Sequence, residues 1–514
     1  MIQQPRRSIL SGFVTGFGST DMEKVSHMFD KIRHRGPWLS GIWDDGHGSV
    51  LAQNYLRADT RAADRDTPVP LSDGNGLRIC YDGQIGNAEE IADAEGVEKG
   101  PFLEERLLLA LYRKYGSAML SFLDDAIFSF VVSDGGKIFA ARDLLGIKTL
   151  FYGKHEDTLY LVSELKSLVH ITDDVYEFPP AHSMDREGTL SRYDKLPSAP
   201  PRPLDHGHEQ MGKQIREIIK NSVRSRIDFS VPTAALLSGG MDSSVVTAVA
   251  TRYLRETAGK HAKLKTFSIG VKESQDIKNA RIMASHLGTD HEELIVGLEE
   301  IVACLNEVIY HLESFDPSLV RSSVSNFLIS RYAHEKGFEI LLSGEGGDEI
   351  FCGYTYLKNF PHEELFSRQM ECIDYLHNNA SLRLDRMNQA NSIRVVAPLI
   401  SGKLLRYAMK IPSLFKQRPD GNKKIEKWIF RKAYEKFLPQ TITRRIKQEF
   451  SQGSGTAGLL PGYFDARVSD EEYTRAREKY PHIRSKEEHY YFHLFSKRFG
   501  TGKAVDTVGQ WISL

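Results

Sequence analysis

The feature that most constrains this chain is a stretch of small residues after an apolar run near its middle. Residues 233–237 form an apolar, strand-like run that leads into Ser238-Gly239-Gly240-Met241-Asp242-Ser243-Ser244, and a helical apolar pattern begins at Val245. Glycines in such a turn let backbone N–H groups approach an anion, and the helix start adds unpaired N–H groups and the positive end of its dipole. The stretch therefore predicts a phosphate-binding turn.

The same stretch suggests a nucleotide and a metal. Asp242 offers a carboxylate oxygen of the kind that holds Mg²⁺, and the turn lacks the Gly-Lys-Ser ending of a Walker loop. A glycine-rich turn without a ligand is the alternative, but each position has a separate chemical use. The stretch resembles the signature of ATP pyrophosphatases, which cleave ATP between its α- and β-phosphates. We expect ATP contacts from Leu236, Ser238, Gly239, Gly240, Asp242, Ser243, Ser244 and Ser268.

Length and composition set the class of protein. The chain has 514 residues, enough for two or three domains, and is 41% hydrophobic and 26% charged, as soluble globular proteins are. Its net charge of -1 argues against binding to nucleic acid or an anionic membrane. No apolar run suits a bilayer span or a signal peptide. The four cysteines are scattered, so we expect no disulfide framework or zinc site and a cytoplasmic location.

The first 200 residues differ from the rest. Short β-like runs separated by turn clusters predict a strand-rich α+β sandwich with a helix over residues 103–115. The runs are residues 12–14, 50–52, 77–81, 127–132, 137–140 and 158–162. A proline-rich segment at residues 197–203 continues neither a helix nor a central strand, and so marks a boundary. We expect one domain over residues 1–200 and a second over 201–514.

The second domain opens with an amphipathic helix around residues 211–223, after which strand-like and helical segments alternate. We expect strands at 234–237, 265–269 and 338–342, and helices at 245–253 and 277–287. Alternation of this kind predicts a parallel sheet with helices on both faces and a ligand at the carboxyl ends of the strands. From Tyr354 onward the pattern is mostly helical.

A second glycine-rich turn, Ser343-Gly344-Glu345-Gly346-Gly347-Asp348, follows the third of these strands. Both turns should meet at one sheet edge, where Asp348 joins Asp242 on Mg²⁺ and Gly344 contacts ATP. Glu345 would then point toward the α-phosphate. A glycine-rich loop with solvated acids is the alternative for this turn read alone.

Two lysines are candidates for the cation that such a site needs, because breaking an adenylate or a tetrahedral intermediate develops negative charge. Most lysines in residues 422–427 and 444–450 are expected to be solvated surface. Lys447 and Lys424 are the two we expect to reach the site.

These stretches together resemble the asparagine synthetase B family over essentially the full chain, a family that includes β-lactam synthetases. Further matches are Arg33-His34-Arg35-Gly36-Pro37, residues 142–147 and 163–166, Asp276, residues 290–292 and 310–313, and Lys447-Gln448-Glu449-Phe450. The resemblance implies an Ntn-hydrolase-like αββα sandwich related to class II glutamine amidotransferases, then an ATP-pyrophosphatase-type α/β synthetase domain with a mostly helical carboxy-terminal part. It implies an acyl-adenylate, released pyrophosphate, and an amide formed with an amine.

The amino-terminal half departs from this family. A working glutaminase there begins with Cys directly after the initiator Met, whereas Ile2 follows Met1 and Ser11 stands where the Cys is expected. A Ser nucleophile would need ten residues to be removed. Asp82 and Gln84 replace an oxyanion-binding Asn and an ammonium-binding Glu, and Glu104 stands where an Asp is usual. We expect a degenerate domain that no longer hydrolyses glutamine.

The synthetase half departs in its substrate pocket. Arg394 and Val396 replace a Glu and an Arg of asparagine synthetases, which suggests an amino-acid-like carboxylate other than aspartate or different packing. Glu345 matches asparagine synthetases, whereas β-lactam synthetases carry a Tyr there within a Tyr–Glu dyad. Glu345, with Tyr354 beside it, is therefore the candidate base.

Three functions compete. The first is a β-lactam synthetase-like enzyme of specialised metabolism that closes an intramolecular amide. The second is an ammonia-dependent asparagine synthetase or an intermolecular amide synthetase, and the third a non-catalytic ATP-binding protein. The joint presence of the site residues argues against the third. The expected ligands are ATP, Mg²⁺ and a small carboxylate. A homodimer is one candidate assembly, and the sequence leaves the oligomeric state open.

Overall fold

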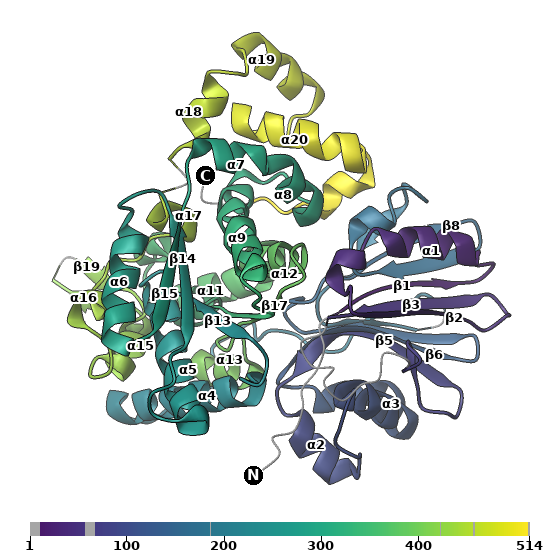
Figure 1. The fold of residues 1–514 in the computed structure, drawn as a ribbon, viewed down its shortest axis with the longest axis horizontal. Helices are drawn as coiled ribbons and strands as arrows, with labels where there is room; N and C mark the ends of the chain where they lie inside the picture. The colour runs from purple at the N-terminus through teal and green to yellow at the C-terminus, as the bar shows by residue number, and fades with distance from the viewer. Residues whose placement is uncertain (1–10, 57–66, 186, 422, 456–457, 512–514) are drawn as a thin grey trace. The chain divides into compact units, whose positions relative to one another are not determined.

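The computed structural model describes residues 11–56, 67–185, 187–421, 423–455 and 458–511 (Figure 1). The chain divides into two compact units. The first contains residues 1–196, 389–394 and 498–509, and the second contains residues 197–388, 395–497 and 510–514. The first unit therefore contains two short later segments, 389–394 and 498–509, in addition to the amino-terminal residues. No helix among the described residues is long and apolar enough to cross a membrane.

The first unit contains two antiparallel sheets. One has the strand order β10-β8-β9-β1-β3-β2 and the other β12-β11-β7-β6-β5-β4. The strands are β1 Ser11–Phe17, β2 Leu39–Asp44, β3 Ser49–Tyr55, β4 Leu71–Ser72, β5 Leu77–Ile85, β6 Ala126–Asp134, β7 Lys137–Arg142, β8 Phe151–His155, β9 Thr158–Val162, β10 Val175–Glu177, β11 His182–Met184 and β12 Leu190–Arg192. Its helices include α1 Met22–Asp30, α2 Ala88–Glu95 and α3 Leu103–Tyr115.

Alternation along the strands builds the layers of this unit. In β6, Phe130 belongs to the core beneath α3, whereas the next residue, Val131, belongs to the core between the two sheets. Successive side chains of a strand point to opposite faces, so a sheet covered on both faces is apolar on both. Helix α1 packs against β1 and β3 of the other sheet. The result is the predicted αββα sandwich, with α1 on one side and α2 and α3 on the other (Figure 1).

The second unit is built on a sheet of order β15-β14-β13-β16-β17. Its strands are β13 Thr233–Leu236, β14 Lys265–Gly270, β15 Asp290–Ile295, β16 Ile340–Leu342 and β17 Arg394–Val396, and a separate hairpin joins β18 Arg418–Asp420 and β19 Lys423–Ile425. Strand β13 pairs in parallel with β14 and with β16. The carboxyl ends of β13 and β16 therefore lie side by side.

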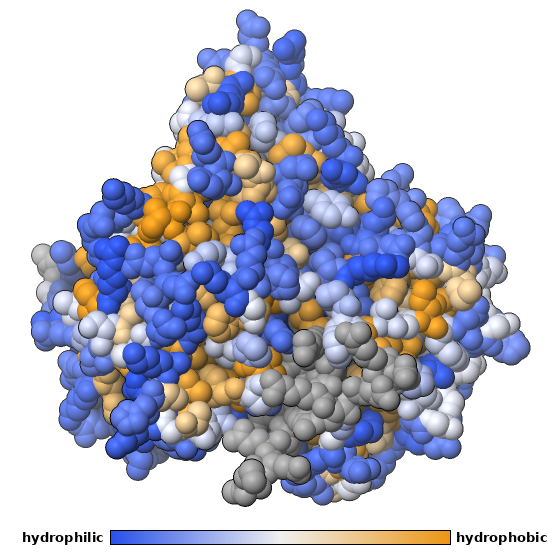
Figure 2. Space-filling model, in the orientation of Figure 1, coloured by the Kyte–Doolittle hydropathy of each residue, from blue (hydrophilic) through white to orange (hydrophobic). Residues whose placement is uncertain are grey.

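Helices make up most of the rest of this unit. They are α4 His208–Arg226, α5 Met241–Ala258, α6 Gln275–Leu287, α7 Leu298–Ala303, α8 Leu305–Leu312, α9 Pro317–Glu335, α10 Gly347–Phe351, α11 Leu365–Asp374, α12 Ala380–Gln389, α13 Gly402–Met409, α14 Ser413–Lys416, α15 Trp428–Tyr434, α16 Gln440–Thr443, α17 Phe450–Gly453, α18 Leu460–Asp465, α19 Asp470–Lys479 and α20 Lys486–Phe499. Every residue of α19 is exposed or half-buried, and the tip that it occupies is mainly hydrophilic in Figure 2.

The predicted fold class is confirmed in both halves. All six strands predicted before residue 200 are present, although β1 and β5 are longer than the apolar runs that suggested them. Strand β15 was not among the predicted strands. Its sequence, Asp290-His291-Glu292-Glu293-Leu294-Ile295, has no apolar run because it lies at the edge of the sheet, where its side chains are half-buried or exposed.

Candidate active site

The first glycine-rich turn joins β13 to α5 in a shape that only small residues allow. Gly239 has φ +65°, and a Cβ there would lie 2.4 Å from the backbone carbon of Asn279. The hydroxyl oxygens of Ser238 and Ser243 lie 3.1 Å apart, and the Gly240 N–H donates to Ser238 Oγ over 3.2 Å. Helix α5 begins at Met241 without a side-chain cap, so its first N–H groups are available to an anion.

The second turn, between β16 and α10, packs directly on the first. A Cβ on Gly344 would lie 2.4 Å from the Ser243 nitrogen, and one on Gly347 would lie 2.3 Å from Asp242 Oδ1. Both glycines are therefore required by the close approach of the two turns. The predicted meeting of the turns at one sheet edge is present, because β13 and β16 are adjacent and parallel.

Two carboxylates and two lysines lie where the turns meet. Lys427 pairs with Asp242 and, over 2.8 Å, with Asp348 Oδ1. Lys447 pairs with the other oxygen of Asp348. Burial alone would raise the pKa of Asp348, but the two ammonium groups outweigh it and lower this pKa to about 2. Asp348 is thus held as a carboxylate across the physiological pH range.

The pKa values of Asp242 and Lys447, in the same cluster, shift for related reasons. Burial raises the pKa of Asp242, and the Asp348 carboxylate adds to that rise, while Lys427 opposes it. The pKa of Lys447 is raised: burial opposes the charged form, but Asp348 and Asp242 together favour it more strongly. The cluster thus places two cations against two acids.

This cluster forms one wall of a pocket of about 1040 Å³ that is partly open to solvent. Leu236, Ser238, Gly240, Asp242, Ser243, Ser268, Gly344, Glu345, Asp348 and Lys447, all predicted site residues, line it. Its apolar walls include Phe267, Ile269 and Ile329. Ser268 Oγ lies 3.2 Å from His291 Nε2 of β15, which holds its hydroxyl in place. A cleft that combines apolar walls with many converging polar and charged groups suits a nucleotide and a small polar substrate.

Four predicted site residues, Tyr354, Lys424, Gly239 and Ser244, are not among the described residues that line this pocket. The Tyr354 hydroxyl donates to Glu349, not to Glu345, over 2.6 Å in a buried position. Lys424, in the β18–β19 hairpin, donates its ammonium to the Phe360 carbonyl. Gly239 and Ser244 belong to the turn but do not line the pocket: Gly239 packs on Asn279, and Ser244 is fully buried in α5.

The two aspartates fit a divalent cation. Asp242 Oδ1 is buried and accepts no hydrogen bond from any residue that the structure describes. Leaving a buried carboxylate oxygen without a partner is costly, so this oxygen is a natural ligand for a hard cation. Carboxylates from two aspartates, together with phosphate oxygens, are a common Mg²⁺ environment.

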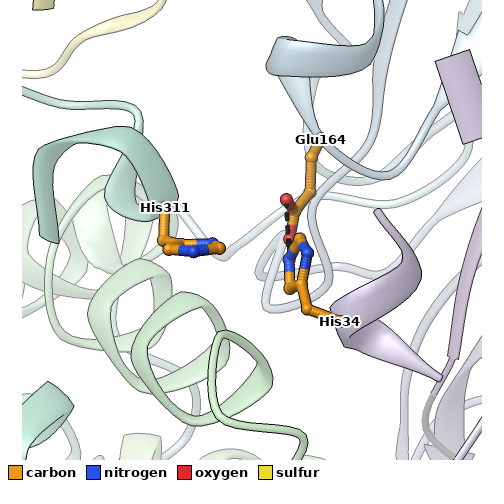
Figure 3. A group of neighbouring side chains, drawn as sticks. All are labelled: His34, Glu164 and His311. Atoms are coloured by element: carbon orange, nitrogen blue, oxygen red, sulfur yellow. Dashed lines mark hydrogen bonds and ion pairs between the residues drawn. The ribbon is translucent and has the colours of Figure 1, made fainter. Parts of the chain in front are cut away.

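The first unit holds a buried charge network around Ser11. Arg35 pairs with Asp82 over 2.7 Å and with Glu164 over 2.8 Å, and it also donates to the Ser11 carbonyl. Lys148 lies 3.0 Å from Asp82. Figure 3 shows the ring of His34 against the Glu164 carboxylate, 3.2 Å away. Burial lowers the pKa of His34, although the Glu164 carboxylate opposes this.

Ser11 itself is fully buried in this network. Its hydroxyl donates to the Tyr81 carbonyl and accepts a hydrogen bond from the Gln53 amide over 2.6 Å. The Tyr81 hydroxyl in turn donates to Glu104. Each of these polar groups is therefore already engaged within the sandwich.

Comparisons with known proteins agree with both units. Residues 214–371 and 358–493 match the family model described as asparagine synthase, and residues 9–187 match the glutamine amidotransferase domain. A probable glutamine-hydrolyzing asparagine synthetase of Schizosaccharomyces pombe is 32% identical over 95% of this chain and 92% of its own length. The corresponding enzyme of Zea mays is 32% identical over 96% of this chain and 87% of its own.

This chain belongs to the asparagine synthetase family. It is accordingly an ATP-dependent ligase that forms carbon–nitrogen bonds and releases AMP and pyrophosphate. Membership of this family does not support the third function considered from the sequence, a non-catalytic ATP-binding protein.

Sequence reasoning missed three site residues of this asparagine synthetase family member. Lys427 was passed over for Lys424, although both stand in one lysine-rich run. Arg445, which donates to the Ser238 carbonyl over 3.0 Å and pairs with Asp276, was not among the predicted site residues. Arg383 of α12 pairs with Glu345 across 38 positions of sequence. The apolar helix after Lys427, with Ile429 and Phe430 fully buried, was the one available sign that this lysine begins a buried element.

Proposed function

We propose that the second unit binds ATP with its phosphates at the turn of residues 238–244 and transfers AMP to the carboxylate of a small amino-acid-like substrate. The observation that carries this proposal is the cluster of Asp242, Asp348, Lys427 and Lys447 at the junction of the two turns. Two cations and two metal-binding acids beside a run of free N–H groups suit a pyrophosphate leaving group.

The residues divide the work of that step. The N–H groups at the start of α5 would hold phosphate oxygens, and the Ser238 and Ser243 hydroxyls would add donors. Asp242 and Asp348 would hold Mg²⁺, which neutralises phosphate charge and polarises the bond between the α- and β-phosphates. With these acids engaged by the metal, Lys427 and Lys447 would be free to turn toward the negative charge that develops on pyrophosphate.

Glu345 is the proposed base for the amine. It lines the pocket beside the second turn, and Arg383 pairs with it. An attacking ammonium must lose a proton before its nitrogen can act as a nucleophile, and a carboxylate within reach accepts that proton. Arg383 would hold the Glu345 carboxylate in one orientation until the amine arrives.

We further propose that the nitrogen does not come from glutamine hydrolysed in the first unit. Ten residues precede Ser11, so its nitrogen is an amide rather than a free amine. Its hydroxyl is buried against Tyr81 and Gln53, and an Asp82 carboxylate paired with Arg35 offers no N–H to an oxyanion. These features support a structural role for the sandwich.

The product favoured by the pocket is an amide formed with free ammonia or a separate amine. Glu345 matches the residue of asparagine synthetases, and Tyr354 is engaged with Glu349 instead. Closure of an intramolecular amide, as in β-lactam synthetases of specialised metabolism, is the second candidate. It is favoured by Arg394 and Val396, which replace residues of the aspartate pocket.

Pyrophosphate release tests the proposal. The full chain is given Mg·ATP and aspartate with ammonium, with glutamine or with neither. Release that requires ammonium and yields asparagine supports the first candidate, whereas release with glutamine at least equal to that with ammonium refutes the structural role of the sandwich. If all three are silent, diamino and β-amino acids are tried without added nitrogen, and turnover there supports ring closure.

The matched control in this assay uses two Asp-to-Asn changes. Asp348→Asn should lower the rate of pyrophosphate release by about 100-fold or more, because it removes a proposed metal ligand. Asp470→Asn, on the surface helix α19, should leave the rate unchanged. Equal rates for Asp348→Asn and the unmodified chain would refute the metal assignment.

A further inference from the structure

The segment that carries Lys447 is anchored by a buried acid outside the pocket. Glu426 is 4% exposed. Its carboxylate pairs with Arg431 and Lys358, and one of its oxygens accepts the backbone N–H of Lys447 over 3.2 Å. A buried carboxylate with three donors around it is stabilised in its ionised form; correspondingly, its pKa is lowered because these cations outweigh burial.

Arg431 extends the same anchor along the chain. One of its terminal nitrogens donates to the carbonyls of Thr443 and Arg445, each over 2.8 Å, and its Nε donates to the Glu426 carbonyl over 2.8 Å. Arg431 thus holds the backbone before Lys447, while Glu426 holds the backbone at Lys447. The segment from Thr443 to Lys447 has no helical or strand hydrogen bonding of its own beyond the end of α16. These bonds therefore define its path, together with those of the Arg445 side chain to the Ser238 carbonyl and to Asp276.

The position of Glu426 also links the two catalytic lysines. Lys427 follows Glu426 directly and adopts φ +54°, and it begins the turn into α15. The Glu426 side chain therefore contacts the backbone of Lys447, and the next side chain, Lys427, lies between Asp242 and Asp348. A shift of one lysine relative to Asp348 would move the other.

We propose that Glu426 is a positioning residue that sets the Lys447 ammonium against Asp348, and thereby fixes the cation that meets the departing pyrophosphate. This inference rests on the phosphate site of the proposed function. Glu426 acts through the backbone of Lys447 and does not itself touch the substrate. Removing its carboxylate frees the segment and leaves the Arg431 guanidinium without its acid.

The affinity for magnesium pyrophosphate, measured by calorimetry on the full chain, tests this inference without knowledge of the carboxylate substrate. Glu426→Ala should weaken binding by about tenfold, the scale of one lost hydrogen bond to a charged acceptor. Glu426→Gln keeps an oxygen for the Lys447 N–H and should weaken binding by about threefold. Glu435→Gln, at an exposed pair with Lys432 on the same stretch, is the matched control and should bind as the unmodified chain does.

A double-mutant cycle separates positioning from general loss of stability. Lys447→Ala alone should weaken pyrophosphate binding by about tenfold or more, and adding Glu426→Ala to it should change the affinity by less than about twofold, because the two act through one group. The inference would be overturned if the affinity losses of the two single variants multiplied in the double variant, or if Glu426→Ala and Glu426→Gln both bound pyrophosphate with unchanged affinity. If Glu426→Ala does not fold, the cycle is run with Glu426→Gln. An unmodified chain that fails to bind pyrophosphate would instead refute the phosphate site itself.

Discussion

Lys427 makes the sharpest prediction, because it is a nearly buried cation between two acids. Its side chain is 2% exposed, and it contacts Asp242 and Asp348 together. In Lys427→Met the two carboxylates keep only Lys447. Removing one partner of a buried ion pair costs about 3–5 kcal/mol, because the remaining charge stays desolvated. For a unit of more than 200 residues, about 2 °C per kcal/mol then gives a fall in Tm of about 6–10 °C.

The pH dependence of that loss follows from the same charges. In the unmodified chain Asp348 has a pKa lowered to about 2, so its stabilising contribution is present above its unfolded pKa and is lost as pH falls through about 2. In Lys427→Met two neighbouring carboxylates share less positive charge, so a carboxyl pKa rises above its unfolded value. That contribution is favourable at low pH and lost as pH rises, so the Tm difference should be larger at pH 8 than at pH 5.

Magnesium provides the decisive comparison. Scanning calorimetry with and without Mg²⁺ should show a Tm gain in Lys427→Met that exceeds the gain in the unmodified chain, because the metal replaces the missing ammonium. Lys432→Met, at an exposed pair with Glu435, is the control and should shift Tm by less than about 1 °C. A Tm loss in Lys427→Met no larger than in this control, or no added response to Mg²⁺, would refute the charge argument.

Two further predictions concern other buried features. Lys416 is 1% exposed, its ammonium donates to Gln369, and burial lowers its pKa to about 8; because this pKa lies below the unfolded one, stability is present at high pH and lost as pH falls through about 8. Lys416→Met should flatten the rise in unfolding free energy between pH 8 and 10. The control is Lys410→Met, at an exposed position. An unaltered pH profile in Lys416→Met would contradict the lowered pKa of Lys416. Gly347→Ala would place a Cβ 2.3 Å from Asp242 Oδ1 and should weaken Mg·ATP binding by about tenfold. Gly462→Ala, where a Cβ meets nothing within 4 Å, should not, and equal affinities in the two variants would show that the close approach is not needed.

The turn residues could be read from the sequence because each one serves a local requirement. Ser238, Gly239 and Asp242 stand within a few positions of one another, and a strand followed by glycines and a helix start is a short-range pattern. The same holds for Asp348, which follows a second such turn. Their meeting at one sheet edge also followed, because parallel strands bring their carboxyl ends to the same edge, whereas the direct pairing of β13 with β16 came from the structure.

The partners of those residues could not be read in this way. Lys424 and Lys427 belong to one run, and the choice between them depends on the β18–β19 hairpin, which sends Lys424 toward the Phe360 carbonyl, and on the positive φ of Lys427. Arg383 reaches Glu345 from a different helix. Such pairings depend on how distant elements pack, and no local spacing encodes them.

By itself, then, the sequence determined the elements that obey short-range rules: the alternating strands of the sandwich, the two glycine-rich turns, the two acids, and the absence of a cysteine near Ser11. The tertiary structure alone decided which cations face those acids, that Tyr354 serves Glu349 rather than the pocket, and that Glu426 supports Lys447 from behind. The physical reason is the separation along the chain over which each effect acts. Backbone conformation and hydropathy act between near neighbours in the chain, whereas a buried charge takes its partner from whatever the fold packs against it.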